Sequence, residues 1–120
     1  MRPETEPWWR QAQADLTTAR TTLQAGQYYA VSWFVQQASE KALKALYLER
    51  RGVVPPRTHD LVFLGGEGQA PATIAADLKT LNPTFDLSRY PDPQTGKAPV
   101  DVVTYAMAAE HFVAAERIIG

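Results

Sequence analysis

The chain has 120 residues, of which 45% are hydrophobic and 21% charged, and it contains no cysteine. This size fits one domain over residues 1–120, with the composition of an ordered globular protein. The formal net charge of −1 excludes the strongly basic surface with which proteins hold duplex nucleic acid, although a small local basic patch fits the composition. The absence of cysteine excludes disulfides, thiolate metal sites and cysteine nucleophiles.

Nothing in the sequence indicates a membrane or secretory segment. No apolar run approaches the roughly 20 residues needed to cross a bilayer. The N-terminal residues MRPETEPWWRQ lack the apolar stretch of a secretory signal. We therefore expect a cytoplasmic protein that does not bind a membrane.

The first predicted helix covers about residues 7–25. Pro7 suits its first turn, where the missing N–H costs nothing, and Gly26 suits the left-handed residue that follows a helix end. Between them, apolar residues recur at three- and four-residue steps and define one buried face, which consists of Trp9, Ala12, Leu16, Ala19 and Leu23.

The second predicted helix covers residues 28–51 and is apolar on two sides. Its main stripe consists of Val31, Val35, Ala38, Ala42, Ala45 and Leu46. The roughly opposite side carries Trp33, Leu43 and Tyr47, together with Gln36 and Glu40. Such a helix needs two covers. One is the domain core, and the other is a second helix, the following loop or a partner chain. Because Trp and Tyr are enriched at interfaces, Trp33, Leu43 and Tyr47 are the candidates for a homodimer interface.

The stretch after Gly52 predicts a short helix that follows an extended segment. Two prolines in VVPPRTHDL forbid a helix there, and Thr58 suits the N-cap of a helix over about residues 59–64. Gly65 and Gly66 are expected to break that helix.

The rest of the chain predicts a helix over about residues 71–81, a Pro-rich ordered loop over residues 84–99, and a last helix over about residues 100–119. The expected buried face of the last helix consists of Val102, Tyr105, Ala106, Ala109, Phe112, Val113 and Ile119. No alternating strand pattern with a hairpin turn occurs. The sequence therefore predicts an all-α fold, an antiparallel four- to five-helix bundle of the up-down type with a Pro-rich loop before the last helix.

Three polar side chains line one face of the second predicted helix. Gln36, Glu40 and Lys44 follow one another at four-residue steps. A glutamate four residues before a lysine is the favoured orientation of a helix ion pair, so a structural role is one interpretation. The other is a binding site, in which Lys44 holds a phosphate and Gln36 or Glu40 contacts a base or a sugar hydroxyl.

Two further segments carry candidate ligand-binding residues. His59 lies at a predicted helix start, where an imidazole can cap, pack, or contact an anion together with backbone N–H groups. Arg89 and Tyr90 lie in the predicted loop, where an arginine fork matches phosphate and a tyrosine can stack on a base. The alternative there is a structural Arg89–Asp92 ion pair.

Catalytic and cofactor motifs are missing. The sequence has no nucleophile elbow, P-loop or Rossmann glycine pattern, so we assign no catalytic residue and no cofactor. His111 has no second histidine at helix spacing, which argues against a metal site. We expect His111 to lie at the surface or at an interface.

The segment WFVQQASEKALKALYLERRGVVPPRTHDL resembles the HEPN family, whose prokaryotic members carry a glutamine–alanine–glutamate–lysine run on a long helix, followed by a loop and a histidine–aspartate–leucine start. The stretches ADL, TAR and LQAGQYYA before it, and SRYPD after it, are similar to that family as well. The resemblance covers nearly the whole chain. It implies a helical bundle that commonly forms a homodimer and often pairs with a minimal nucleotidyltransferase as toxin and antitoxin.

Many HEPN relatives are metal-independent ribonucleases, which use an arginine followed four to six residues on by a histidine. That motif is absent here, since seven residues separate Arg51 from His59. Three hypotheses follow. The first is a non-catalytic domain that binds a nucleotide, a short RNA or a nucleotidyltransferase partner. The second is a ribonuclease with a rearranged pair, Arg89 with His59 or His111. The third is a purely structural dimerisation partner.

Overall fold

The computed structural model describes residues 1–120 and is entirely helical. Its elements are α1 (Glu6–Gln24), α2 (Tyr28–Arg51), α3 (Leu61–Glu67), the 3-10 turn η1 (Ala72–Ile74), α4 (Ala75–Leu81), α5 (Thr84–Leu87), α6 (Pro99–Val102) and α7 (Tyr105–Ile119). The predicted all-α class is confirmed. None of these helices combines the length and the apolar character that crossing a membrane requires.

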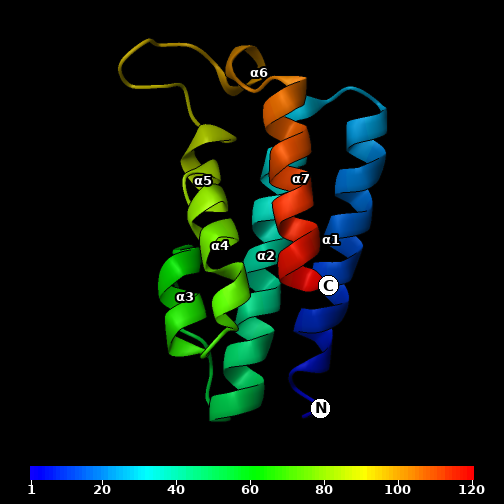
Figure 1. Ribbon diagram of the computed structural model, residues 1–120, viewed down its shortest axis with the longest axis vertical. Helices are drawn as coiled ribbons and strands as arrows, with labels where there is room; N and C mark the ends of the chain where they lie inside the picture. Colours follow the sequence, from blue (N-terminus) through cyan, green and yellow to red (C-terminus); the bar gives the residue numbers. More distant parts are fainter.

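The chain runs up and down the long axis of the molecule (Figure 1). It ascends in α1 and descends in α2, and the segment after Gly52 returns upward to the start of α3. Helix α3 then descends, because His59 before it contacts Glu40 in the middle of α2, while Glu67 at its end pairs with Arg51 at the end of α2. The chain ascends again through α4 and α5 and descends in α7. The third leg of the bundle therefore consists of the short helices α4 and α5, with α3 packed antiparallel to α4, while the other three legs are single helices. The loop between α5 and α6 extends beyond the bundle at the end where α7 begins. The predicted helical bundle is confirmed.

Helix α2 is the central element, and the chain itself covers both of its apolar sides. Helices α1 and α7 pack against it, as do α3 and α5. Leu43 is 2% exposed and belongs to the main hydrophobic core, and Tyr47 is buried as well. The assignment of Leu43 and Tyr47 to a partner-facing surface is therefore corrected, because short helices of the same chain provide the second cover. Trp33 is half-buried and stays a prediction for a dimer contact.

Helix α3 differs from the prediction at both ends. Its N-cap is Asp60, whose side chain accepts a hydrogen bond from the Phe63 backbone N–H, while Thr58 accepts one from the Asp60 N–H. At the other end, Gly65 and Gly66 lie inside the helix instead of breaking it. A Cβ at Gly65 would collide with the Leu78 side chain. The glycine therefore lets α3 and α4 approach closely without a shift of the Leu78 side chain.

The predicted loop and last helix also require correction. Residues 84–87 form the helical turn α5, which the Thr84 and Ser88 hydroxyls stabilise by donating to the Leu81 and Thr84 carbonyls. The predicted last helix is two helices, since Val103 is extended and Thr104 caps α7 by accepting from the Met107 N–H. Within α7 the buried residues are instead Ala108, His111, Phe112, Ala114, Ala115 and Ile119. Tyr105, Ala106 and Val113, which were expected to be buried, are therefore exposed.

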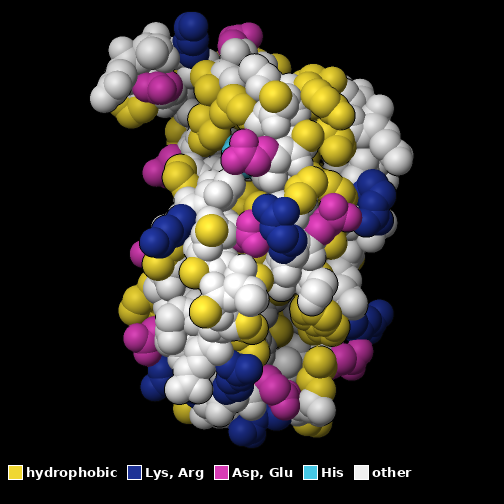
Figure 2. All heavy atoms as spheres, viewed as in Figure 1, with side chains coloured by type: hydrophobic (Ala, Val, Ile, Leu, Met, Phe, Trp, Pro, Cys, Tyr) yellow, Lys and Arg dark blue, Asp and Glu magenta, His cyan; other side chains and the backbone are white.

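Charged side chains are mixed over the surface. Figure 2 shows Lys and Arg interspersed with Asp and Glu on one face, without an extended field of either sign. Ion pairs also join the elements, among them Lys41 of α2 with Asp15 of α1 at 2.6 Å and Arg117 of α7 with Asp77 of α4 at 2.9 Å. Any binding of an anion therefore depends on a local arrangement of charges.

Candidate functional site

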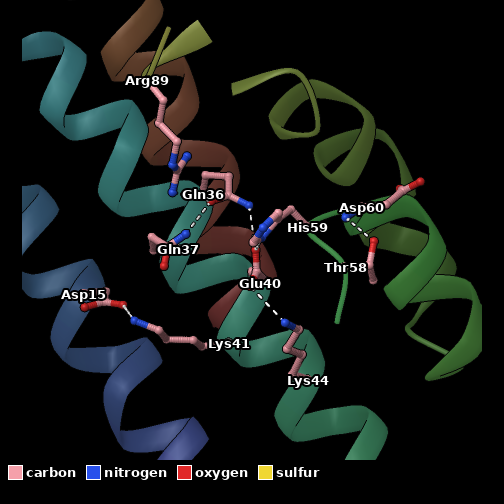
Figure 3. Close-up of polar contacts among 10 residues, drawn as sticks. All are labelled: Asp15, Gln36, Gln37, Glu40, Lys41, Lys44, Thr58, His59, Asp60 and Arg89. Carbon is pink, nitrogen blue, oxygen red and sulfur yellow. Dashed lines mark hydrogen bonds and ion pairs between the residues drawn. The ribbon is translucent and has the colours of Figure 1, made fainter. Parts of the chain in front are cut away.

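A row of buried polar side chains runs along α2. Gln36, Glu40 and Lys44 are 0%, 6% and 8% exposed, although each carries strongly polar atoms. Buried polar groups persist where hydrogen bonds satisfy them. Here Gln36 Nε2 donates to Glu40 Oε1 at 3.1 Å, and Lys44 Nζ donates to Glu40 Oε2 at 3.0 Å (Figure 3). The three residues form one connected network along the helix.

The Glu40 carboxylate is the centre of that network. Besides Gln36 and Lys44, it contacts His59, whose Nδ1 lies 2.8 Å from Glu40 Oε1. Burial raises the pKa of Glu40, but hydrogen bonds from His59, Gln36 and Lys44 outweigh it, so that the net pKa lies below the ordinary value of 4.5. Glu40 is therefore ionised at neutral pH and can only accept hydrogen bonds.

His59 approaches α2 from the segment that connects α2 to α3. Gly52, with a φ of +68°, ends α2 in the left-handed conformation, and the following prolines keep the chain from continuing the helix. The imidazole then points toward Glu40 (Figure 3). Because an ionised carboxylate has no proton to donate, Nδ1 must carry the hydrogen of this bond. A neutral His59 therefore presents an unprotonated Nε2, and 55% of its side chain is exposed.

Arg89 reaches the same network from the segment after α5. Its Nη1 donates to the Phe85 carbonyl at 3.0 Å, and its Nη2 lies 3.4 Å from Gln36 Oε1. Burial lowers the pKa of Arg89, and the nearby Glu40, Tyr90 and Asp86 oppose that change by raising it. An arginine stays charged at neutral pH even so. Its guanidinium therefore places a permanent positive charge beside Gln36.

Aromatic rings hold both basic side chains. The His59 ring stacks on the Phe85 ring, with the centroids 3.9 Å apart and an interplanar angle of 18°. The Arg89 guanidinium carbon lies 3.9 Å from the Phe85 centroid and 4.8 Å from the Trp33 centroid. Such cation–π contacts fix the plane of a guanidinium. Phe85 thus joins the imidazole and the guanidinium in one rigid arrangement.

We call these side chains the polar cluster, whose members are Gln36, Glu40, Lys44, His59, Phe85 and Arg89. Two permanent cations, Lys44 and Arg89, face one carboxylate, so the cluster carries a net positive charge even with His59 neutral. Beside it lies an open cavity of about 460 Å³, lined by His59, Asp60, Val62, Lys79, Asn82, Pro83, Phe85 and Asp86. His59 and Phe85 belong to both, so these two residues are the part of the cluster that lines the cavity.

Five of the six residues predicted to bind a ligand lie in the polar cluster, and Tyr90 does not. Its side chain is 56% exposed and lines a second cavity, next to Arg89 in the chain. The role of Phe85 was missed by sequence reasoning, although its position four residues before Arg89 is a spacing at which helical side chains meet. The predicted Arg89–Asp92 ion pair is not present, since Asp92 instead accepts hydrogen bonds from the backbone of Gln94 and Thr95.

His111 is buried, which corrects its expected surface position. Its Nδ1 lies 2.8 Å from the hydroxyl oxygen of Ser32, and it packs between α2 and α7. Burial lowers the pKa of His111, and Glu110 opposes that change by raising it. No group of three or more His, Asp or Glu side chains is arranged to hold a metal ion. His59 is therefore the histidine that faces a cavity.

Comparisons with known proteins agree with this fold. The HEPN domain family model matches residues 5–120. Protein TT1696 from Thermus thermophilus superposes with a TM-score of 0.87 at 26% identity, covering 98% of this chain and 94% of that one. ST0689, an archaeal HEPN homologue, superposes with a TM-score of 0.79 at 34% identity, covering 99% and 93%. The comparison with curated proteins gave no match. The chain belongs to the HEPN domain family.

Proposed function

We propose that this HEPN domain binds a nucleotide or a short single-stranded RNA, with a phosphate held between Arg89 and His59. The observation that carries the proposal is that both side chains pack on Phe85, and that Phe85 and His59 line an open cavity. The guanidinium supplies forked donors that match phosphate oxygens. The exposed Nε2 of His59 supplies an acceptor, or a donor after the ring takes up a proton.

Preorganisation supports binding at this place. Glu40 fixes the orientation of His59, Gln36 contacts Arg89, and the amide of Gln37 donates to Gln36 Oε1 at 2.8 Å. Side chains that are already ordered lose little further entropy when a ligand arrives. The site is therefore built before the ligand is bound.

Two roles followed from the sequence for Lys44, an ion pair with Glu40 and a phosphate contact. The contacts favour the first, because its ammonium pairs with Glu40 and the Trp8 ring lies 5.8 Å away. With only 8% exposure, it has little surface to offer to a ligand. We infer that Lys44 keeps Glu40 ionised and in place, and that Glu40 in turn orients His59.

The test is binding of ATP and of a short unstructured RNA to the purified protein at two salt concentrations. Phosphate contacts predict binding that weakens as salt rises. Arg89→Ala should weaken binding roughly 10-fold or more, the usual loss for a hydrogen bond to a charged group. Arg10→Ala is the matched control, because Arg10 is exposed on α1 and far from the cluster along the chain. Equal affinities of the two variants would exclude Arg89 from the site.

A second function, metal-independent RNA cleavage, is favoured by one observation. His59 has a carboxylate that orients it and a free Nε2, and Arg89 packs against Phe85, the ring on which His59 stacks. A general base beside a cation is the combination that attack by a ribose hydroxyl on the neighbouring phosphate requires. Cleavage by the unaltered protein that is lost in His59→Ala would support this function. RNA that stays intact after long incubation would support binding without cleavage. A protein that neither binds nor cleaves RNA would fit a role as a partner of another protein.

A further inference from the structure

The second cavity lies where α5 leads into the loop before α6. It has a volume of about 530 Å³, within the range typical of small-ligand sites. Its lining consists of Asp86, Leu87, Tyr90, Pro91, Asp92, Pro93, Gln94 and Val102. Asp86 also lines the cavity beside His59, so the two cavities share a wall.

The chemistry of this second cavity is opposite to that of the polar cluster. Its charged residues are the carboxylates of Asp86 and Asp92, and no lysine or arginine lines it. In the first cavity Lys79 offsets part of the charge of Asp60 and Asp86, but no cation offsets the carboxylates here. A phosphate would therefore be repelled, whereas a group that presents N–H donors would be accepted. Tyr90, which is largely exposed, adds an aromatic ring on which a flat heterocycle can stack.

The two carboxylates are not equally free. Asp92 Oδ1 already accepts hydrogen bonds from the backbone N–H groups of Gln94 at 2.8 Å and Thr95 at 3.3 Å. The side chain of Asp86 makes no hydrogen bond, and no cation lies within ion-pair distance of it. Asp86 can therefore accept two parallel N–H bonds from one ligand.

We propose that the second cavity takes a guanine base, stacked on Tyr90 and read by Asp86 through its N1–H and N2–H donors. This inference rests on the proposed function, since the base would belong to the nucleotide whose phosphate Arg89 and His59 bind. Arg89 packs on Phe85, which lines the first cavity, and its chain neighbour Tyr90 lines the second. Because Asp86 lines both cavities, the phosphate and the base of one nucleotide would lie in adjacent cavities.

The other bases fit a carboxylate less well. Adenine and cytosine each offer one amino group on the pairing edge, beside a ring nitrogen that is itself an acceptor. Uracil offers a single N–H between two carbonyls, and these would repel the carboxylate. A bidentate contact to one base contributes a preference of about 10-fold or more over a base that cannot form it.

The experiment is titration of GMP, AMP, CMP and UMP into the unaltered protein and into three variants, Asp86→Asn, Asp101→Asn and Arg89→Ala. Asp101→Asn is the matched control, since Asp101 is exposed and lines neither cavity. The unaltered protein and the control should bind GMP about 10-fold or more tightly than the other three nucleotides. Asp86→Asn should lose that preference while keeping its affinity for AMP, and Arg89→Ala should weaken all four.

Two results would overturn the inference while leaving the proposed function standing. One is that the unaltered protein binds the four nucleotides with equal affinity and that Arg89→Ala weakens the binding of all four. The other is that the four nucleotides bind equally, while N-acetyl-arginine amide binds to the unaltered protein and not to Asp86→Asn. That result would assign the cavity to a basic side chain of a partner protein. Failure of the unaltered protein to bind any nucleotide would overturn the proposed function and this inference together.

Discussion

Glu40 uses its two carboxylate oxygens to hold three neighbours from two separate segments of the chain. Lys44, one of those neighbours, is almost completely buried beside it. Breaking a buried ion pair is costly, because the remaining charge has lost both its partner and its water. At the scale of single residues, the stability of the polar cluster therefore depends on Glu40 more than on the exposed His59.

Replacing Glu40 with alanine should lower the free energy of unfolding by about 3 kcal/mol, because Lys44 becomes an unpaired buried cation. Urea titration monitored by circular dichroism would measure the change. Glu4→Ala, at an exposed position outside the helices, is the control and should change it little. Adding Lys44→Met to Glu40→Ala should restore part of the loss. A Glu40→Ala protein as stable as the control would show that the pair contributes nothing.

The buried His111 predicts a pH dependence of stability. Burial depresses its pKa in the folded state, while the unfolded chain titrates near 6.5. The unfolded state therefore binds more protons between the two pKa values, and the free energy of unfolding falls as the pH drops below about 6.5. The loss is complete once the pH is below the folded-state pKa.

The prediction is checked by urea titrations at pH 7.5 and pH 5.5 on the unaltered protein and on His111→Asn. The unaltered protein should lose more stability between these pH values than the variant, since asparagine does not titrate. Other ionisable groups contribute equally to both proteins and cancel in the comparison. An identical pH dependence would mean that His111 has the same proton affinity in both states.

At the scale of elements, the site depends on how the short helices pack beside α2. Helices α3 and α4 contact each other where Gly65 faces Leu78, and α5 packs on α2. This packing brings Phe85 of α5 against His59, which precedes α3, so that the two rings stack. A change in the distance between α3 and α4 would therefore disturb the wall of the cavity that contains His59.

Gly65→Ala should destabilise the protein by roughly 1–3 kcal/mol, because the new methyl group would collide with the Leu78 side chain. Gly66→Ala is a matched control in the same helix, where the added methyl group meets open space and helix propensity improves. Thermal or urea unfolding of the two variants should move in opposite directions. Equal effects would show that α4 shifts freely to accommodate a side chain at Gly65.

The long helices were the predictable elements, and the reason is physical. The bounds of α2, Tyr28–Arg51, agree with the prediction because a continuous apolar pattern ends at a glycine that adopts positive φ. The last helix was harder, since its apolar pattern continues through Val103 although the backbone there is extended. Burial of Val103 and the cap by Thr104 depend on tertiary packing, which periodicity does not report.

At the scale of the whole molecule, the fold unites residues that lie far apart in the chain. Arg89 contacts Gln36 from 53 positions away, and His59 contacts Glu40 from 19. The sequence supplied Gln36, Glu40, Lys44, His59 and Arg89 as candidates because of their residue types and their spacing on predicted elements. It could not show that the three segments meet, nor that Phe85 joins two of them, because no local pattern encodes those contacts.

The up-down arrangement explains where the site lies. The open cavity is lined by residues just before α3 and by residues of the short helices α3, α4 and α5, whereas the single long helices α1 and α7 pack closely along the rest of the bundle. His111 lies within that close packing and His59 faces the cavity, so one molecule contains a buried and an exposed imidazole. In a ligand titration, His59 can therefore report binding at the cavity, and His111 can serve as an internal reference.

The most direct test of phosphate binding is a long-range proton–nitrogen NMR spectrum of the two imidazoles during titration with ATP. We expect the free protein to show His59 as the Nδ1–H tautomer, with an unprotonated Nε2 that shifts as ATP binds. The His111 resonances should stay in place, and Arg89→Ala should reduce the shift of His59 at a given ATP concentration. His59 resonances that do not move at saturating ATP, or that move no more than those of His111, would contradict a phosphate site at Arg89 and His59.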